Sequence, residues 1–458
     1  MRDFLKILGG SALADPLHGE GTCAPERIKG TDRPRCAVIG LGNRGRGMAE
    51  WQIPPFADVL AVCDVDARKL APVAEAVRKR TGRAPQVYTD YRRILDREDI
   101  DFVANATPTH WHAKIVVDAC RAGKDVYSEK PLAYNVHEGQ VMRKIVAETG
   151  RIVQIGTQQR SGIHFRIVCD LVRHGRIGKL KQIAVILPGP SMEHGGPCVA
   201  EPVPPELDWD MWSGPAPLHP FCSARLRPSA WSDYGGGLIT EWGVHHMDIA
   251  HWAMGGEEVA PSSIEGWGYC PNLGKPGYPD QFRPFAARLE YPGGVELWFM
   301  SEVPTGKDRA AEGAEEIIQR VYGRLPENIR NYKAPDPEGG VWFIGENGSV
   351  FVGRQGVVAE GIGEVENMPL PPTQHLRWRL CLYEHTRNFV ECVASRRRPV
   401  SYVAEQHRTH LPCHLTNIAL RLGRKVRWDG QREVFLGDAE ANAMLRRPQE
   451  RSPYQLTA

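Results

Sequence analysis

Three glycines, Gly40, Gly42 and Gly45, have the spacing G-x-G-x-x-G and follow a short apolar run. In this pattern the first glycine allows a tight turn and the second lets the backbone approach a pyrophosphate. The third lets a helix pack against the preceding strand. A second apolar run, 59–63, ends at Asp64, where a carboxylate can bind the hydroxyls of an adenosine ribose. These residues predict a dinucleotide site at the ends of the two runs.

The acid at position 64 also bears on the type of dinucleotide. A carboxylate would repel the 2′-phosphate of NADP, so Asp64 favours NAD. Arg44 and Arg46 lie in the same turn, and a guanidinium group can pair with a phosphate. NADP therefore stays open as the alternative cofactor.

The elements expected to hold this site alternate between strands and helices. Apolar runs predict strands at 36–39, 59–63, 100–106, 125–128 and 152–155. Helices are expected between them at 66–80, 90–96, 111–122 and 136–149. This alternation indicates an α/β, doubly wound parallel sheet, a Rossmann domain over 34–156.

A second domain of α+β type is expected over 157–458, built on a large, mostly antiparallel open sheet. Its strands are predicted at 181–187, 263–269, 285–291, 295–300, 341–344 and 350–352, with helices at 164–173, near 308–321 and within 376–423. The segment 188–234 contains ten prolines and few periodic apolar residues. It predicts a long ordered loop, and such loops in compact proteins are usually functional.

Two more motifs follow predicted strands of the first domain, TPTHWH at 107–112 and SEKPL at 128–132. Together with the glycine turn they resemble the glucose–fructose oxidoreductase, inositol dehydrogenase and rhizopine-catabolism (Gfo/Idh/MocA) family, over essentially 34–440. The resemblance implies a dinucleotide-binding domain followed by a domain whose open sheet carries the substrate site and often the oligomer interface. It also implies an oxidoreductase that acts on a sugar, a polyol or a related small molecule.

A glycine-rich stretch at 235–248 resembles the third element of the family, which there ends in Asp-x-x-x-His. His245 falls at the position of the family's catalytic histidine, and Glu241 replaces the usual aspartate. An imidazole with an ordinary pKa of ~6.5 can take the proton of an alcohol. The ammonium of Lys130 can stabilise the developing alkoxide. The resemblance therefore makes Lys130, His245 and Glu241 the expected catalytic residues.

The remaining expected contacts fall into two sets. The glycine turn and the resemblance together give the dinucleotide contacts as Gly40, Gly42, Asn43, Arg44, Gly45, Asp64, Thr107, Pro108, His112, Glu129, Lys130 and Gln158. The expected substrate contacts are Lys130, Arg160, Glu241, His245, Trp212 and Tyr234.

Three functions fit these residues. The first is net transfer of a hydride between NAD(P) and a secondary alcohol of a sugar, polyol or glycoside. The second is an NAD-dependent glycoside hydrolase of the same fold, which works by transient oxidation, elimination and re-reduction. The third is a regulatory protein that binds the cofactor without turnover. An exposed sheet face would favour a homodimer or homotetramer.

Composition narrows the classes of partner. The 458 residues carry 57 Lys and Arg against 55 Asp and Glu, a net charge of +2 that gives no reason to expect a nucleic acid partner. No apolar run approaches the ~18 residues of a membrane span. The 11 cysteines include no C-x-x-C pair, so we expect reduced cysteines rather than a disulfide framework.

Two further patterns concern the location of the protein and a possible metal site. Residues 1–33 read as a leader that resembles the end of a twin-arginine export signal, so both a periplasmic and a cytoplasmic location stay open. His407, His410 and His414 have a spacing that could hold zinc on one helix face, but Pro412 interrupts the helix pattern and no acidic partner is evident. We expect no metal there.

Overall fold

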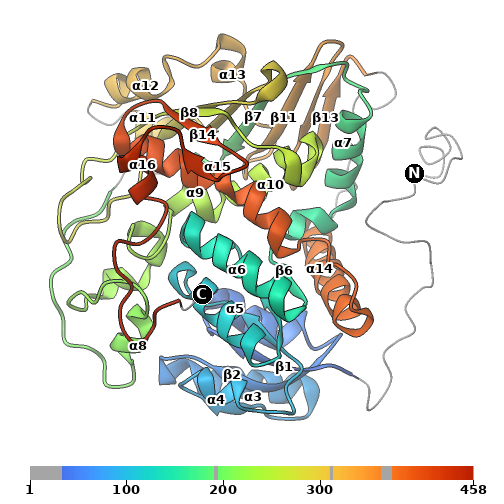
Figure 1. Cartoon of the computed structure of the whole chain (residues 1–458), viewed down its shortest axis with the longest axis vertical. Coiled ribbons are helices and arrows are strands. Elements are labelled where there is room, and N and C mark those ends of the chain that lie inside the picture. Colours follow the sequence, from blue (N-terminus) through green and yellow to red (C-terminus); the bar gives the residue numbers. More distant parts are fainter. Residues whose placement is uncertain (1–32, 190–193, 310–312, 363–373, 457–458) are drawn as a thin grey trace, which may run out of the picture.

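The computed structural model describes residues 33–189, 194–309, 313–362 and 374–456, so the expected leader lies, apart from Arg33, outside the described residues. Two sheets organise these parts of the chain, a parallel one at the bottom of Figure 1 and a larger one at the top. None of the described helices is long and apolar enough to cross a membrane.

The first domain has a six-stranded parallel sheet in the order β3-β2-β1-β4-β5-β6, as predicted for a doubly wound fold. Its strands are β1 (Arg35–Ile39), β2 (Asp58–Cys63), β3 (Gln86–Tyr88), β4 (Phe102–Asn105), β5 (Asp125–Ser128) and β6 (Val153–Ile155). Its helices are α2 (Asn43–Gly47), which continues into a π-helical turn at Met48–Gln52, α3 (Leu70–Thr81), α4 (Arg92–Leu95), α5 (His112–Arg121) and α6 (Val136–Thr149). Apolar clusters cover both faces of the sheet.

The second domain is built on a nine-stranded sheet in the order β13-β12-β11-β7-β10-β9-β8-β14-β15. All neighbouring pairs are antiparallel except β7 and β10. The strands are β7 (Leu180–Leu187), β8 (Ser263–Gly268), β9 (Phe285–Glu290), β10 (Glu296–Ser301), β11 (Gly340–Gly345), β12 (Ser349–Val352), β13 (Val357–Glu360), β14 (Val426–Asp429) and β15 (Val434–Phe435). The mostly antiparallel sheet expected from the sequence is confirmed.

The second domain has helices on both faces of this sheet and others that lie away from it. They are α7 (Ile163–Arg173), α8 (Trp209–Ser213), α9 (Gly237–Glu241), α10 (Gly243–Met254), α11 (Gly306–Arg309), α12 (Ala314–Tyr322), α13 (Glu327–Asn331), α14 (Gln374–Ser395), α15 (Val403–Leu422) and α16 (Ala439–Ala443). The main core packs α7, α10 and α15 against one face, whereas α12 and α13 cover part of the other. The homodimer or homotetramer stays a prediction.

The two domains share buried contacts. Phe389 of α14 packs edge-on against Phe102 and Tyr127 of the first sheet, with ring centroids 5.1 and 5.7 Å apart. Helix α15 contacts α6 of the first domain and β8 of the second (Figure 1). Aromatic side chains buried at such a junction resist separation of the layers.

The expectation that the cysteines are all reduced is wrong for one pair. Cys198 and Cys222, 24 residues apart in the proline-rich loop, form a disulfide. The other cysteines of the described residues are free, and all of them except the half-buried Cys270 are buried, as expected for small apolar side chains. Spacing in the sequence gave no sign of this pair because the loop's own path brings the two sulfurs together.

Candidate functional site

A cavity of about 420 Å³ opens at the carboxyl ends of β1, β2, β4 and β5. Ligands bind at this edge of open parallel sheets. The cavity is lined by Ile39, Gly40, Gly42, Asn43, Arg44, Cys63, Asp64, Val65, Lys69, Thr89, Tyr91, Ala106, Thr107, Pro108, Thr109, Trp111, Ile115, Glu129, Lys130, Met211, Trp212, Leu226, Pro228 and Glu241. It therefore joins most of the expected dinucleotide contacts to Lys130, Trp212 and Glu241.

The glycine turn has the geometry that a dinucleotide cradle needs. Gly40 has a φ of +84°, and an added Cβ would lie 2.8 Å from the backbone of Ala106. An added Cβ at Gly45 would lie 1.7 Å from the carbonyl oxygen of Gly40, so only glycine lets the helix start against the turn. An added Cβ at Gly42 would meet nothing within 4 Å, because this glycine borders the cavity.

The carboxylate of Asp64 is fixed at the end of β2. It accepts hydrogen bonds from the backbone N–H of Leu41 at 2.6 Å and of Asp66 at 2.9 Å. Nζ of Lys69 lies 3.3 Å away, an additional charge on the cavity wall that sequence reasoning missed. The side chain is thus held in place by the backbone of the glycine turn itself.

The two arginines that could have favoured NADP have carboxylate partners. Arg44 donates to Glu129 at 2.7 Å, and Arg46 donates to Glu50 at 2.6 Å. Burial alone would raise the pKa of Glu129, but the charges of Arg44 and Lys130 hold that pKa below its ordinary value. Glu129 is therefore a carboxylate that ties the glycine turn to the end of β5, directly before Lys130.

Some expected dinucleotide contacts lie behind the cavity wall instead of on it. His112 bonds through its ring nitrogens to the carbonyl oxygens of Pro131 at 2.6 Å and Thr107 at 2.9 Å. Gln158 donates to Glu129 at 3.0 Å. Neither residue lines the cavity, and both brace residues that do.

Lys130 and Glu241 lie at the other end of the cavity, and His245 lies near enough to Lys130 to feel its charge but does not line the cavity. Lys130 and Glu241 line it, and the charge of Lys130 acts on both Glu241 and His245. Within the described residues, none of the three side chains makes a hydrogen bond or ion pair, and Nδ1 of His245 is buried without a partner. A ligand or an ordered water can complete the bonding of such a buried atom.

Burial and neighbouring charges bring the pKa values of Glu241 and His245 closer together. Burial raises the pKa of Glu241, an effect that the charges of Lys130 and Arg283 partly offset. Burial lowers the pKa of His245 well below its ordinary value, and the charges of Arg354 and Lys130 lower it further. His245 is therefore neutral at pH 7 and free to accept a proton.

The structure separates the other expected substrate contacts. Trp212 lines the cavity, whereas Tyr234 packs behind it, with ring centroids 4.9 Å apart. Arg160 is buried in a bidentate ion pair with Asp248 at 2.7 Å and a second pair with Glu405 at 2.8 Å. Its charge is used between helices, and it does not reach the cavity lining.

Two of the histidines at 407–414, where we expect no metal, bond to groups of the protein. His407 bonds to Glu433 at 2.9 Å, and Nδ1 of His410 accepts from the backbone N–H of Leu132 at 3.0 Å. Across the described ranges, no group of His, Cys, Asp and Glu is arranged to hold a metal ion.

Sequence reasoning missed part of the cavity wall and one nearby charge. Met211, Leu226 and Pro228 come from the proline-rich loop and line the cavity beside Trp212. Arg283 lies near enough to Glu241 to affect its pKa, and its side chain has no hydrogen-bond or ion-pair partner among the described residues. No local motif marks these positions, because only contacts between segments that are distant in the sequence bring them to the site.

Two family descriptions match the chain over both domains. "Oxidoreductase family, NAD-binding Rossmann fold" matches 34–157, and "Oxidoreductase family, C-terminal alpha/beta domain" matches 196–268 and 338–456. The chain belongs to the Gfo/Idh/MocA oxidoreductase family. Its cofactor is NAD, and the residues fit that group: Gly42 leaves open space in the turn, and Asp64 lies on the same cavity wall.

Individual relatives agree with the family and differ in activity. The chain is 25% identical to scyllo-inositol 2-dehydrogenase (NAD(+)) of Bacillus subtilis, over 80% of this chain and 88% of that protein. It is 30% identical to alpha-N-acetylgalactosaminidase of Shewanella oneidensis, but spans only 33% of that protein's length. Among solved structures, myo-inositol 2-dehydrogenase of Lactobacillus plantarum matches with a TM-score of 0.57 and 20% identity, covering 86% of this chain and 99% of that one.

Proposed function

We propose that this protein transfers a hydride between NAD(P) and a secondary alcohol of a sugar, polyol or glycoside, and that Lys130, His245 and Glu241 act on the hydroxyl group. The observation that carries the proposal is a group of three titratable side chains, two of which line the NAD cavity, that have no hydrogen-bond or ion-pair partner among the described residues. Groups that are left unpaired in this way gain most from a ligand that offers both donors and acceptors, as a polyhydroxy compound does.

Lys130 and His245 can divide the work on the hydroxyl. When bound, NAD supplies the hydride acceptor for the alcohol carbon. The ammonium of Lys130 donates a hydrogen bond to the alcohol oxygen and stabilises the negative charge that develops there. His245, neutral because its pKa is lowered, accepts the hydroxyl proton.

We expect Glu241 to contact a different part of the substrate from Lys130 and His245. It lines the cavity next to Lys130, and its raised pKa makes its carboxylate a stronger acceptor than an exposed glutamate. We assign it to a neighbouring hydroxyl of the substrate, or to the proton that His245 releases. Trp212 offers an apolar surface against which the carbon face of a ring can pack.

The proposal can be tested by offering sugars, polyols and glycosides to the purified protein with excess NAD. Net oxidation predicts NADH in amounts that match the product, followed by its near-ultraviolet absorbance. Lys79→Ala on the exposed surface of α3 is the matched control for Lys130→Ala, because it removes a lysine far from the cavity lining. NADH formation that survives unchanged in Lys130→Ala would refute the role of Lys130.

A second candidate is hydrolysis of a glycoside with transient oxidation, supported by the similarity to alpha-N-acetylgalactosaminidase. It would use the same three residues, since the first step is again removal of a hydroxyl proton. Release of the aglycone from a chromogenic glycoside without accumulation of NADH would favour this function over net oxidation. Binding of NAD and a sugar with neither outcome would favour the regulatory protein.

A further inference from the structure

The part of the proline-rich loop at 207–234, called the cap below, covers the cavity beside the glycine turn. It places Met211, Trp212, Leu226 and Pro228 on the cavity wall. Its own small core holds Trp209 stacked on Trp212, with ring centroids 4.7 Å apart, together with Phe221, Trp231 and Tyr234. The cap is thus a packed unit that sits on the cofactor cavity.

The first half of the cap is joined to the NAD-binding domain. The backbone N–H of Asp208 donates to Val65 at 3.0 Å, and Nε1 of Trp111 donates to the carbonyl of Met211 at 3.0 Å. The C-terminal segment, which runs beside α8 in Figure 1, adds a contact from Tyr454 to Asp210 at 2.8 Å. These bonds secure the wall formed by Met211 and Trp212.

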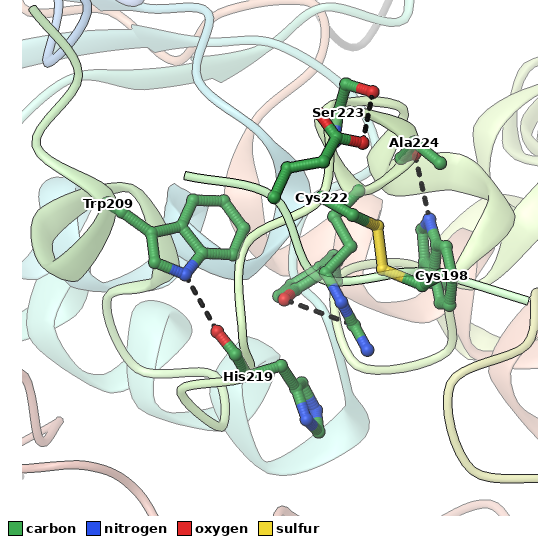
Figure 2. The surroundings of a disulfide bond; sticks show 10 residues. Cys198, Trp209, His219, Cys222, Ser223 and Ala224 are labelled. Carbon is green, nitrogen blue, oxygen red and sulfur yellow. Dashed lines mark hydrogen bonds between the residues drawn. A yellow bond between two sulfur atoms is a disulfide. The ribbon is translucent and has the colours of Figure 1, made fainter. Parts of the chain in front are cut away.

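The second half of the cap is joined to a different neighbour. Cys222 is linked by the disulfide to Cys198, and Ser223 donates to Glu201 at 2.9 Å (Figure 2). The backbone N–H of Cys198 in turn donates to the carbonyl of Gly277 in the second domain at 2.7 Å. Leu226 follows Cys222 by four residues, so the disulfide secures the wall that contains Leu226 and Pro228.

Two of the links of this second half, the disulfide and the bond between Ser223 and Glu201, differ in strength. Cys222 is 1% exposed, whereas Glu201 and Ser223 lie at the surface, where water competes for their hydrogen bond. If the disulfide opens, this segment keeps non-covalent links, which include the Glu201–Ser223 bond, a backbone bond from Glu201 to Phe221 at 2.8 Å and a bond from Nε1 of Trp231 to the carbonyl of Ala224 at 3.1 Å. A segment held by non-covalent contacts alone opens locally more easily than one that is also cross-linked.

We propose that the Cys198–Cys222 disulfide is a redox-sensitive fastening of the cap that determines how fast the bound dinucleotide leaves the cavity. In the reduced protein the wall of Leu226 and Pro228 swings away readily and NAD exchanges. In the oxidised protein the wall stays in place and NAD is retained. A protein loaded with NAD in a reducing compartment would then keep it in an oxidising one, where disulfides persist.

The switching step is an ordinary thiol–disulfide exchange. A dithiol such as dithiothreitol gives two electrons and two protons, the S–S bond breaks, and Cys198 and Cys222 become thiols while the reagent closes to its cyclic disulfide. Cys198 is only partly buried, so the reagent can approach from its side. Oxidised dithiothreitol or oxidised glutathione reverses the step.

The test measures the dissociation of NADH from the folded protein. NADH is bound, an excess of NAD is mixed in, and the loss of protein-enhanced NADH fluorescence is followed by stopped flow. Alkylation and mass spectrometry report whether Cys198 and Cys222 are free. We expect dissociation to be at least about tenfold faster after reduction. Cys198→Ser/Cys222→Ser should be fast under both conditions.

Two controls separate the cap from general effects. Cys270→Ser removes the other partly buried cysteine and should behave like the wild type. Glu201→Ala removes the surface link, and should speed dissociation more in the reduced protein than in the oxidised one. A change of less than about twofold in both the reduced wild type and the double variant, with cleavage confirmed, would overturn the proposal. If the double variant does not fold, the rate of NADH dissociation from the reduced wild type is enough to test the proposal.

Discussion

The two ends of the cavity are built in opposite ways. At the dinucleotide end, the charged side chains have protein partners: Asp64 is held by backbone N–H groups, and Arg44 is held by Glu129. At the end proposed for the substrate, Lys130, Glu241 and His245 have no such partners within the described residues. The first arrangement is rigid before any ligand arrives, whereas the second leaves its bonding capacity for the ligand. Charged groups that the protein already holds in place suit binding of the cofactor. Groups without a protein partner can act on a substrate.

The largest expected effect comes from removing a charge at the unpaired end. Lys130→Ala should lower kcat by a factor on the order of 10²–10⁴, because the developing alkoxide loses its cation. NAD affinity, measured by titration of protein fluorescence, should change by less than about threefold, because the partnered end is untouched. A loss of NAD binding that matches the loss of kcat would show that the two ends are not separate.

The glycine turn offers a matched pair that separates cofactor binding from folding. Gly42→Ala should weaken NAD binding by about tenfold or more while leaving thermal unfolding unchanged, because its Cβ enters the open cavity. Gly45→Ala should destabilise the fold by about 1–3 kcal/mol, because its Cβ would meet the Gly40 carbonyl. Calorimetry and NAD titration on both variants check this, and equal effects on stability would contradict the assignment.

The ribose contact at the partnered end predicts a smaller effect. Asp64→Ala should weaken NAD by about tenfold and NADP by less, because the carboxylate no longer binds the hydroxyls or repels a 2′-phosphate. Lys69 would keep its charge beside the vacated position. Titration with both dinucleotides measures the ratio, and equal weakening of the two would exclude the ribose contact.

The unpaired end should also have a distinct pH dependence. Burial and the charges of Arg354 and Lys130 lower the pKa of His245, so its neutral form persists as the pH falls below ~6.5. The acid limb of kcat/KM for oxidation should therefore lie below pH ~6.5. Arg354→Met removes one positive charge, raises the pKa of His245 and should move that limb to higher pH. An acid limb that Arg354→Met leaves unmoved would argue against His245 as the base.

A weaker pH effect concerns the stability of the whole fold. Burial lowers the pKa of several histidines, to about 3 for His110, His246 and His410. Their folded forms stay neutral while the unfolded chain binds protons below its ordinary pKa of ~6.5, so stability falls as the pH drops through that value. Thermal unfolding between pH 7.5 and about 5 measures this, and a constant midpoint would contradict the burial of neutral imidazoles.

How well the sequence predicted each part depends on the range of the interactions involved. The strands β1, β2, β4, β5 and β6 are apolar runs followed by a turn, and their positions were predicted to within two residues. The strand β3 was missed because Gln86–Tyr88 is short and largely exposed, so it has no apolar signature.

The candidate site shows the same limit. Gly40, Asp64 and Lys130 follow strands at fixed places, and their position on the cavity was predictable. Arg160 was expected at the substrate, but its charge is taken up by Asp248 from a helix far along the chain. The disulfide and the wall of Leu226 and Pro228 depend on the folding of the loop, which local spacing does not encode.

The most direct test of the central claim is a single-turnover experiment on protein saturated with NAD. The loaded protein is mixed with each member of a panel of sugars, polyols and glycosides, and the absorbance of the reduced nicotinamide on the protein is followed. Both alcohol oxidation and the hydrolytic route predict that at least one compound reduces the bound NAD, briefly or lastingly, in the wild type and not in Lys130→Ala. Reduction at the wild-type rate in that variant would contradict the claim that the unpaired end acts on the hydroxyl.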